Sequence, residues 1–468
     1  GFALDLDNGT WIIYRNGSSL GTVQTGIDTT LTYFAAVGAS GGTISDFDVT
    51  CNFGQDSTFG GAISAGGNSD GNGFGDFKYS VPSGYLACTT GNLPISDDID
   101  PAQTDDDYPG KNFNVVTYTG DGSTSNAISN LGFSPDLVWI GQRSSPTSDY
   151  SNGMWDTTRG RAKLIYSSRS NAEPSDSSST QDLVSFDSDG FTVGTNNNTA
   201  SNGSSKEYVA WCWKANGGTT SSNTQGDITT TVQANQKAGF SIFTYTGNAG
   251  GAGVTLGHGL SKAPDIWLVK QRSNNGEASQ KRWRMCLNTG TGGAFRFLNN
   301  SAQTLTLANS NVASALYRNE GNFEPTATVV QMPNNGNANA FFNLSGATYV
   351  SYCWHSVEGY SKFGVWEGNA NNDGPFIYTG FRPRMVFIKS VDTTAPWLVW
   401  DTARNTFNPA NKGLAWNDSA AESDYTGYPA DILSNGFKLR SSNATINASG
   451  TWIYGAWGDV PFKYNNTF

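Results

Sequence analysis

The sequence predicts an all-β, multidomain protein built from tandem β-sandwich-like modules. Short runs of β-branched and aromatic residues, such as residues 10–14, alternate with clusters of Gly, Asn, Ser and Asp, which is the pattern of short strands joined by turns. No segment has the periodicity of a long amphipathic helix. A chain of 468 residues also exceeds one ordinary core, so about two to four domains are expected.

The composition excludes several classes of protein and partner. Charged residues make up 14% of the chain and aromatic residues 13%, so there is enough apolar surface to bury, and disorder is excluded. A net charge of −11 argues against nucleic acid and anionic lipid, because both require clustered Lys and Arg. No apolar run is long enough for membrane insertion. No signal peptide is visible, and because the chain opens like the inside of a strand, we expect upstream sequence to be missing.

The five cysteines predict neither a disulfide framework nor a zinc site. Their number is odd, their spacing is wide and no CxxC pair occurs. We interpret them as small buried hydrophobic residues. Cys212 and Cys353 occupy the same position in two of the repeats described below, where the third repeat has Ala456. Alanine can replace a small buried residue but not a metal ligand, so we expect no metal and no cofactor.

Residues 1–95 form the first predicted module. A strand-like run over residues 10–14 is preceded by Asn8-Gly9 and followed by Asn16-Gly17, the strongest short-range hairpin signal. Further runs that belong to the same pattern are residues 3–7, 49–55 and 82–85. Together these runs resemble the SPRY domain, a lectin-like (concanavalin-like) β-sandwich. The resemblance covers less than a full domain, so we expect its N-terminal strands to be absent. It implies a binding module without catalytic chemistry.

Two linkers are predicted from composition. Residues 96–110 contain six aspartates and two prolines, and like charges repel while proline prevents regular structure. Carboxylate oxygens can hold Ca²⁺, but this segment lacks the fixed spacing and glycine turn of an EF-hand loop, so we favour a solvated linker. Residues 218–236 open with Gly, Thr and Ser, which predicts a flexible linker.

Between and beyond these linkers the chain repeats itself, over residues 111–217 (repeat 1), 237–357 (repeat 2) and 358–468 (repeat 3). Each repeat is long enough to hold its own core. Three landmarks recur in order: an aromatic-Thr-Gly triplet, a proline followed by a hydrophobic strand, and a closing aromatic strand. The closing strands alternate poorly between apolar and polar residues, which predicts burial on both faces. The landmarks begin at Tyr118, Pro135 and Tyr208 in repeat 1, at Tyr245, Pro264 and Tyr349 in repeat 2, and at Tyr378, Pro383 and Trp452 in repeat 3.

The most site-like residues belong to repeats 1 and 3. Residues 155–159, Trp-Asp-Thr-Thr-Arg, match residues 400–404, Trp-Asp-Thr-Ala-Arg, whereas repeat 2 has no Asp-Thr-x-x-Arg sequence. An aromatic ring beside an Asp and an Arg suits contact with a sugar. The same residues can instead form an ion pair that fixes a turn beside a core tryptophan. We favour the structural interpretation, because repeats most easily retain the residues that define their fold. The candidate ligand-binding residues are Trp155, Asp156, Arg159, Trp400, Asp401 and Arg404.

Four short sequences follow one another in repeat 1. They are Pro-Asp-Leu-Val-Trp from Pro135, Trp-Asp-Thr-Thr-Arg-Gly from Trp155, Ser-Asp-Gly-Phe from Ser188 and Tyr-Val-Ala-Trp-Cys-Trp from Tyr208. In this order they resemble tandem modules of tail-fibre-like virion proteins of marine tailed phages, especially those that infect cyanobacteria. The resemblance implies a structural, host-facing protein of the virion, extracellular when mature. It also implies a homo-oligomer that contacts other virion proteins and a glycan or protein of the host surface.

No catalytic site is predicted. The Gly-x-Ser-x-Gly motif is absent, neither His258 nor His355 has a nucleophile motif nearby, and no Asp/Glu pair stands out as that of a glycosidase. We therefore expect a non-enzymatic tail fibre or appendage that contacts the host surface. Three alternatives stay open: a capsid decoration or filament-forming architectural subunit, a polysaccharide-degrading tailspike with its site between subunits, and a bacterial surface adhesin.

Overall fold

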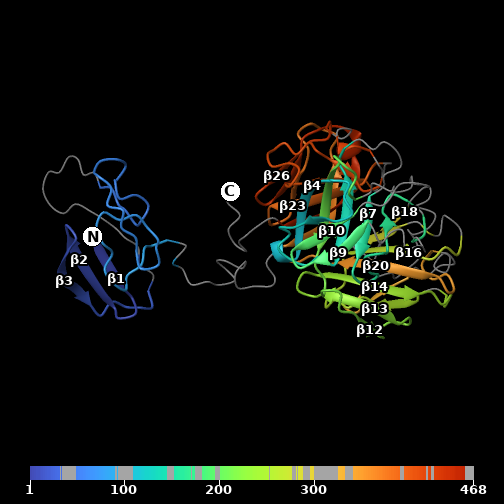
Figure 1. Ribbon diagram of the computed structural model, residues 1–468, viewed down its shortest axis with the longest axis horizontal. Helices are drawn as coiled ribbons and strands as arrows, with labels where there is room; N and C mark the ends of the chain where they lie inside the picture. The colour runs from blue at the N-terminus through green and yellow to red at the C-terminus, as the bar shows by residue number, and fades with distance from the viewer. Residues whose placement is uncertain are drawn as a thin grey trace. The chain divides into compact units, whose positions relative to one another are not determined.

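Antiparallel β-strands make up almost all of the regular structure in the computed structural model, which confirms the all-β fold class (Figure 1). The chain divides into two compact units, Gly1–Ser96 and Asp97–Phe468. The described helical turns, η2 (Pro109–Lys111) and α4 (Ala444–Asn447), are short. Among the described residues, no helix has the length and apolarity needed to span a membrane. The structure describes residues 1–31, 33, 49–89, 92, 109–144, 152–169, 171–173, 182–194, 201–251, 253–276, 281, 283–287, 296–299, 325–332, 341–390, 395–417, 420–422 and 426–458.

The first unit contains a three-stranded antiparallel sheet. Its strands are β1 (Phe2–Asp5), β2 (Thr10–Arg15) and β3 (Ser18–Thr25), in that order. The predicted hairpin at Asn16-Gly17 is confirmed: the two residues have φ angles of 51° and 82°, the left-handed conformation that a two-residue hairpin turn requires. The predicted acidic linker, apart from Pro109 and Gly110, lies outside the described residues.

One face of this sheet carries large apolar side chains that stay exposed. Phe2, Leu4 and Trp11 are 53%, 37% and 38% exposed, and Leu4 pairs directly with Trp11 across the strands. Ala3 and Ala87 are the hydrophobic residues of the unit that are buried within its described part. The interpretation of all cysteines as buried is wrong for this unit, because Cys51 and Cys88 are exposed; it is confirmed for Cys212, Cys286 and Cys353.

Each repeat of the second unit contains a large sheet and a small sheet that face each other. In repeat 1, the inward residues of both sheets share one core, which includes Trp155 of the large sheet and Phe191 of the small one. The large sheet consists of β4 (Phe113–Thr119), β11 (Glu207–Trp213), β6 (Leu137–Gln142), β7 (Gly153–Asp156) and β8 (Ile165–Tyr166). The small sheet consists of β5 (Asn126–Ile128), β10 (Gly190–Val193) and β9 (Leu183–Asp187).

Repeat 3 has the same two sheets in the same strand order. The large sheet consists of β21 (Ser361–Gly368), β28 (Gly450–Gly458), β23 (Pro383–Ser390), β24 (Leu398–Asp401) and β25 (Leu414–Ala415). The small sheet consists of β22 (Phe376–Tyr378), β27 (Gly436–Leu439) and β26 (Ala430–Leu433). Trp400 lies in the core between them, as Trp155 does in repeat 1.

Repeat 2 keeps this plan and extends it. Its seven-stranded sheet consists of β12 (Ser221–Asn223), β13 (Thr230–Asn235), β14 (Phe240–Thr246), β20 (Thr348–Trp354), β16 (Ile266–Gln271), β17 (Arg284–Leu287) and β18 (Arg296–Asn299). The small sheet consists of β15 (Thr255–Gly257) and β19 (Val329–Gln331). The core between these two sheets contains Trp267 and Val330, so repeat 2 is again a sandwich.

The structure corrects the flexible linker predicted over residues 218–236. Two strands, β12 and β13, lie within that segment and extend the large sheet of repeat 2. The segment is also bound to repeat 1, because Gln233 Nε2 donates to the hydroxyls of Thr157 and Thr158 at 2.7 and 2.6 Å. Hydroxyl-rich residues suit an edge strand as well as a linker, which is why composition alone misled the prediction.

The structure also corrects one repeat landmark. Tyr118 and Tyr245 lie on β4 and β14, but Tyr378 lies on β22 of the small sheet. The counterpart in repeat 3 is Trp366 on β21, because it pairs with Trp452 as Tyr118 pairs with Tyr208. All three pairs are stacked, with ring centroids 5.1, 4.8 and 5.3 Å apart in repeats 1, 2 and 3.

The large sheets are buried on both faces, as the sequence predicts for the closing strands. On β11, Tyr208, Ala210 and Cys212 point into the sandwich core of repeat 1. The alternate residues Val209, Trp211 and Trp213 point the other way, into a core shared by all three repeats. Strand periodicity therefore divides each large sheet between its own core and the common one. The residue boundaries of the predicted modules stay predictions.

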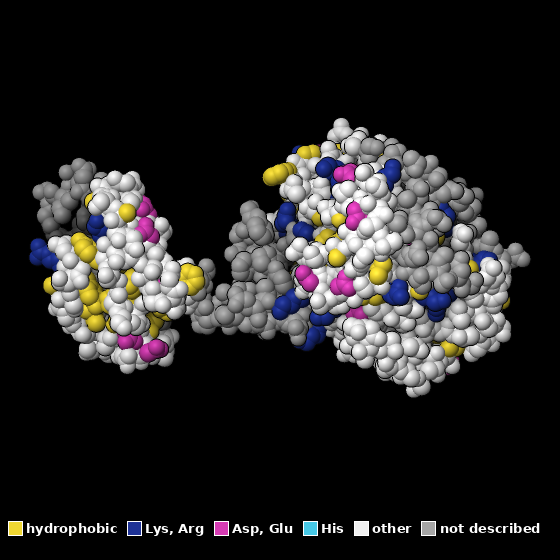
Figure 2. Space-filling model, in the orientation of Figure 1, with side chains coloured by type: hydrophobic (Ala, Val, Ile, Leu, Met, Phe, Trp, Pro, Cys, Tyr) yellow, Lys and Arg dark blue, Asp and Glu magenta, His cyan; other side chains and the backbone are white. Residues whose placement is uncertain are grey.

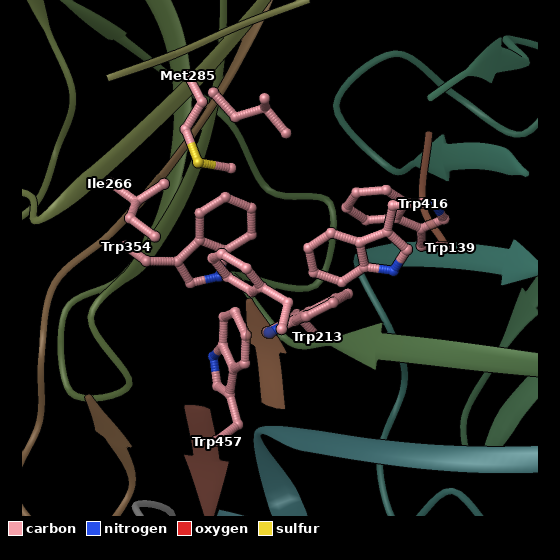
Figure 3. A pocket seen from close by; sticks show the side chains of 9 residues that line it. Trp139, Trp213, Ile266, Met285, Trp354, Trp416 and Trp457 are labelled. Atoms are coloured by element: carbon pink, nitrogen blue, oxygen red, sulfur yellow. The ribbon is translucent and has the colours of Figure 1, made fainter. Parts of the chain in front are cut away.

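Three equivalent tryptophans meet at the centre of the shared core. Trp213 and Trp354 end the closing strands β11 and β20, Trp457 lies one residue before the end of β28, and Figure 3 shows the three rings gathered around one point. The three pairs of ring centroids are 5.9, 5.3 and 6.1 Å apart, each in an edge-to-face arrangement. The cavity between them has a volume of about 10 Å³, room for at most one water molecule. The repeats thus close into a ring with approximate threefold symmetry.

Candidate functional site

The first candidate site is the turn that follows β7. Asp156 ends the strand, and Arg159 folds back onto its carboxylate: the backbone N–H of Arg159 donates to Oδ1 at 2.8 Å and Nε donates to Oδ2 at 2.5 Å. The remaining guanidinium nitrogens donate to the carbonyls of Lys163 and Met154 at 2.5 and 3.3 Å. Both charged side chains have no exposed surface. We call this pair the repeat 1 clamp.

The second candidate site has the same geometry. The backbone N–H of Arg404 donates to Asp401 Oδ1 at 2.9 Å, and Nε donates to Oδ2 at 2.7 Å. Further donations go to the carbonyls of Lys412 and Val399 at 2.7 and 3.1 Å. These side chains are also fully buried. We call this pair the repeat 3 clamp.

Each clamp binds an aromatic side chain of the neighbouring repeat. The Tyr352 hydroxyl of repeat 2 donates to Asp156 Oδ2 at 2.7 Å, and Trp211 Nε1 of repeat 1 donates to Asp401 Oδ2 at 3.1 Å. Tyr352 and Trp211 occupy the same position on β20 and β11, two residues before the final tryptophan. The carboxylates therefore accept from a neighbour's buried donor as well as from their own arginine, which compensates the charges of each clamp.

A second ion pair accompanies each clamp. Nε of Arg272 in repeat 2 lies 2.9 Å from Oε2 of Glu173 in repeat 1, and Nε of Arg143 in repeat 1 lies 2.8 Å from Oε2 of Glu422 in repeat 3. The backbones of these pairs are also hydrogen-bonded. The N–H of Glu173 donates to the carbonyl oxygen of Arg272 at 2.8 Å, and the N–H of Glu422 donates to that of Arg143 at 3.0 Å. The junctions between repeats 1 and 2 and between repeats 3 and 1 are thus built from the same parts.

The junction between repeats 2 and 3 lacks both halves of this device. Strand pairing places Leu287 of repeat 2 where repeats 1 and 3 have their aspartates. On the opposite side, Gly455 of repeat 3 stands where the other repeats have Trp211 and Tyr352. A Cβ at Gly455 would lie 2.3 Å from Cε1 of Phe387, so a phenylalanine ring fills that place. The loss of both halves at one junction indicates that clamp and aromatic residue act as a unit.

The structure places all six sequence-predicted site residues inside the protein. Trp155 and Trp400 are fully buried between the sheets of repeats 1 and 3, and the clamp residues are buried at the junctions. A ligand could reach neither ring without separating the sheets. Sequence reasoning missed the aromatic and ionic partners. One signal was present, because Gln-Arg-Ser follows the second landmark strand in repeats 1 and 2, at Arg143 and Arg272, but not in repeat 3.

Comparison with protein families assigns most of this chain. The family model described as Domain of unknown function (DUF7483) matches residues 108–461. The chain belongs to this family. The matched DUF7483 region contains repeats 1 and 2, repeat 3 up to residue 461, both clamps and the central tryptophans, so the ring corresponds to one family domain. No curated protein matches the chain.

The two histidines of the DUF7483 region are buried. His258 Nε2 lies 3.1 Å from the Thr326 carbonyl oxygen, and burial lowers the pKa of His258 to about 4. Burial also lowers the pKa of His355 below its ordinary value. Within the described parts of the chain, no three His, Cys, Asp or Glu residues are grouped in a way that could hold a metal ion.

Asp182 is a buried acid for which the described residues supply no compensating charge. Its Oδ1 has no hydrogen-bond partner among the described residues, and burial raises its pKa from 3.8 to about 7. The folded chain therefore holds this proton more tightly than the unfolded chain between these two values. Its contribution to stability falls as pH rises through this window.

Replacement of Asp182 by Asn is expected to flatten this pH dependence and to raise the free energy of unfolding at pH 8 by at least about 1 kcal/mol. Urea unfolding of both proteins between pH 4 and pH 8 measures the effect. Equal slopes with pH in the two proteins would show that Asp182 ionises freely in the fold.

Proposed function

We propose that this chain is a non-enzymatic structural protein of a tailed-phage virion, a tail fibre or related appendage that contacts the host surface. The proposal rests on the observation that both clamps join neighbouring repeats. The residues that most resemble a ligand site hold neighbouring repeats together, so the ring acts as a scaffold. Any contact with a host is therefore made by the exposed faces of the ring. Functional residues commonly lie on such surfaces of a rigid framework.

Surface composition supports contact with a hydrated partner. Where Figure 2 colours the DUF7483 region, uncharged polar side chains and backbone predominate, with charged groups scattered among them. Such a surface offers hydrogen bonds without a strong field, which suits polysaccharide better than nucleic acid. The sequence resemblance of repeat 1 to phage tail-fibre modules points to the same role.

A second candidate role is architectural, as a capsid decoration or filament subunit. The apolar face formed by Phe2, Leu4 and Trp11 favours it, because an exposed apolar patch marks a surface that another protein covers. In this role the chain would bind copies of itself or other virion proteins and no host ligand.

Labelling of intact particles with antibodies against the DUF7483 region separates these roles. The host-contact role predicts label at the tips of appendages, and binding of the purified chain to host cells that falls when surface glycans are stripped. Regular label over the shell or tube, with no binding to cells, would replace it with the architectural role. Release of reducing ends from host polysaccharide would contradict both.

A further inference from the structure

Repeat 3 exposes two aromatic rings side by side on one strand. Phe376 and Tyr378 of β22 are 45% and 57% exposed, whereas Ile377 between them is buried in the sandwich core. Because successive side chains of a strand point to opposite faces, the two rings lie together on the outer face of the β22-β27-β26 sheet.

The fold does not require these rings. The inward residue that corresponds to Ile377 is the partly buried Ile128 in repeat 1 and the buried Leu256 in repeat 2, since each pairs with the inward residue of the next strand. The residues that flank it are Ala127 and Ser129 in repeat 1 and Thr255 and Gly257 in repeat 2. Two sister sandwiches therefore form with small residues at the positions where repeat 3 carries aromatic rings.

Glycine and charged side chains surround the two rings. Tyr378 pairs across the sheet with Gly436, where a Cβ would lie 3.0 Å from Cε2 of Phe376, so the missing side chain leaves room for that ring. Phe376 pairs with Lys438, whose ammonium lies 2.7 Å from Asp373. The Lys362 ammonium lies 4.9 Å from the centre of the Tyr378 ring.

The chemistry of this face fits a neutral sugar. Aromatic rings offer flat apolar area to the C–H face of a pyranose, and the adjacent ammonium and carboxylate groups can bind its hydroxyls. Lys438 is neutralised by Asp373, and Arg440, the residue directly after the same strand β27, lies 3.1 Å from Asp431, so these two cations add little attraction for an acidic ligand. We propose that Phe376 and Tyr378 form a platform that binds neutral pyranose units of a surface polysaccharide, an inference that rests on the proposed host-contact function.

A variant that copies repeat 1 tests the platform. Phe376→Ala/Tyr378→Ser places in repeat 3 the residues that repeat 1 already carries at these positions, so the sheet is expected to form. Phe407→Ala is the matched control, because Phe407 is 86% exposed and lies on the same repeat away from β22. Calorimetric titration of the full chain with cello-, malto-, manno- and galacto-oligosaccharides, and with oligogalacturonate as an acidic probe, measures binding.

The expected result is binding of at least one neutral oligosaccharide, about tenfold weaker in the double variant and unchanged in Phe407→Ala. Equal affinity of the double variant, or no binding of any neutral probe, would overturn the platform. Stronger binding of oligogalacturonate than of every neutral probe would overturn the choice of ligand. A change in oligomeric mass of the double variant, with unchanged sugar binding, would make the rings a contact between chains.

Attachment to host cells distinguishes this inference from the proposed function. If wild type and double variant attach equally, the platform fails and the host-contact role stands. If wild type does not attach although it binds a neutral oligosaccharide, the host-contact role fails and the platform stands.

Discussion

Arg159→Ala is expected to lower the free energy of unfolding by about 3–5 kcal/mol. The change removes the guanidinium from Asp156 and leaves a carboxylate without exposed surface, held only by the Tyr352 hydroxyl and one backbone N–H. An uncompensated charge in a junction between repeats costs much more than the pair contributes. Arg404→Ala is expected to act similarly on Asp401, which keeps the donation from Trp211 Nε1. Urea unfolding followed by tryptophan fluorescence measures both.

The control is Arg440→Ala, which removes a partly exposed ion pair with Asp431 and should cost about 0–1 kcal/mol. A second variant, Asp156→Leu/Arg159→Met, replaces the whole pair by apolar residues and copies the leucine that repeat 2 has at this position. It should be less damaging than Arg159→Ala, because no unpaired aspartate is left, and Glu173, which also contacts Arg159, keeps its ion pair with Arg272. A loss in Arg159→Ala no larger than that of the control would mean that the clamp is open to solvent.

Trp213→Ala is expected to lower the free energy of unfolding by about 3–5 kcal/mol. Trp213 is 1% exposed and contacts the equivalent tryptophans of both other repeats, so its removal opens a cavity where all three repeats meet. Trp213→Phe should cost less, because a ring remains. Denaturant unfolding measures the change in midpoint.

Trp11→Ala is the control for the loss of an indole, because Trp11 is 38% exposed on the first unit. It should change the unfolding of the DUF7483 region by no more than about 0.5 kcal/mol. A cost for Trp213→Ala near that of Trp11→Ala would contradict the shared core.

Much of the local structure could be predicted from the sequence, because local chemistry determines it. The hairpin at Asn16-Gly17 follows from residues that adopt positive φ, and the closing strands read as buried on both faces because they lack alternation. The clamp could be predicted as an Asp–Arg pair beside a buried tryptophan, since all its parts lie within five residues.

The partners of the clamp could not be predicted, because Tyr352 lies 196 positions from Asp156 and Trp211 lies 190 from Asp401. The false landmark at Tyr378 has a physical cause too. The feature that the opening strands share is a glycine, not the Tyr-Thr-Gly triplet. A Cβ at Gly120, Gly247 or Gly368 would lie 2.2, 2.3 or 1.9 Å from a carbonyl oxygen. In repeat 3 this glycine comes after Trp366 and not after a tyrosine-threonine pair. The prediction matched identical residue types, whereas the true counterparts share the same structural surroundings.

We infer that the three repeats form one ring that opens as a unit. Amide hydrogen exchange of wild type and Trp213→Ala, followed in peptides that cover β11, β20 and β28, tests this inference. We expect the variant to accelerate exchange in all three strands by the same factor, because each strand reaches the shared aromatic centre. Acceleration confined to β11, with β20 and β28 unchanged, would show that the three sandwiches open independently.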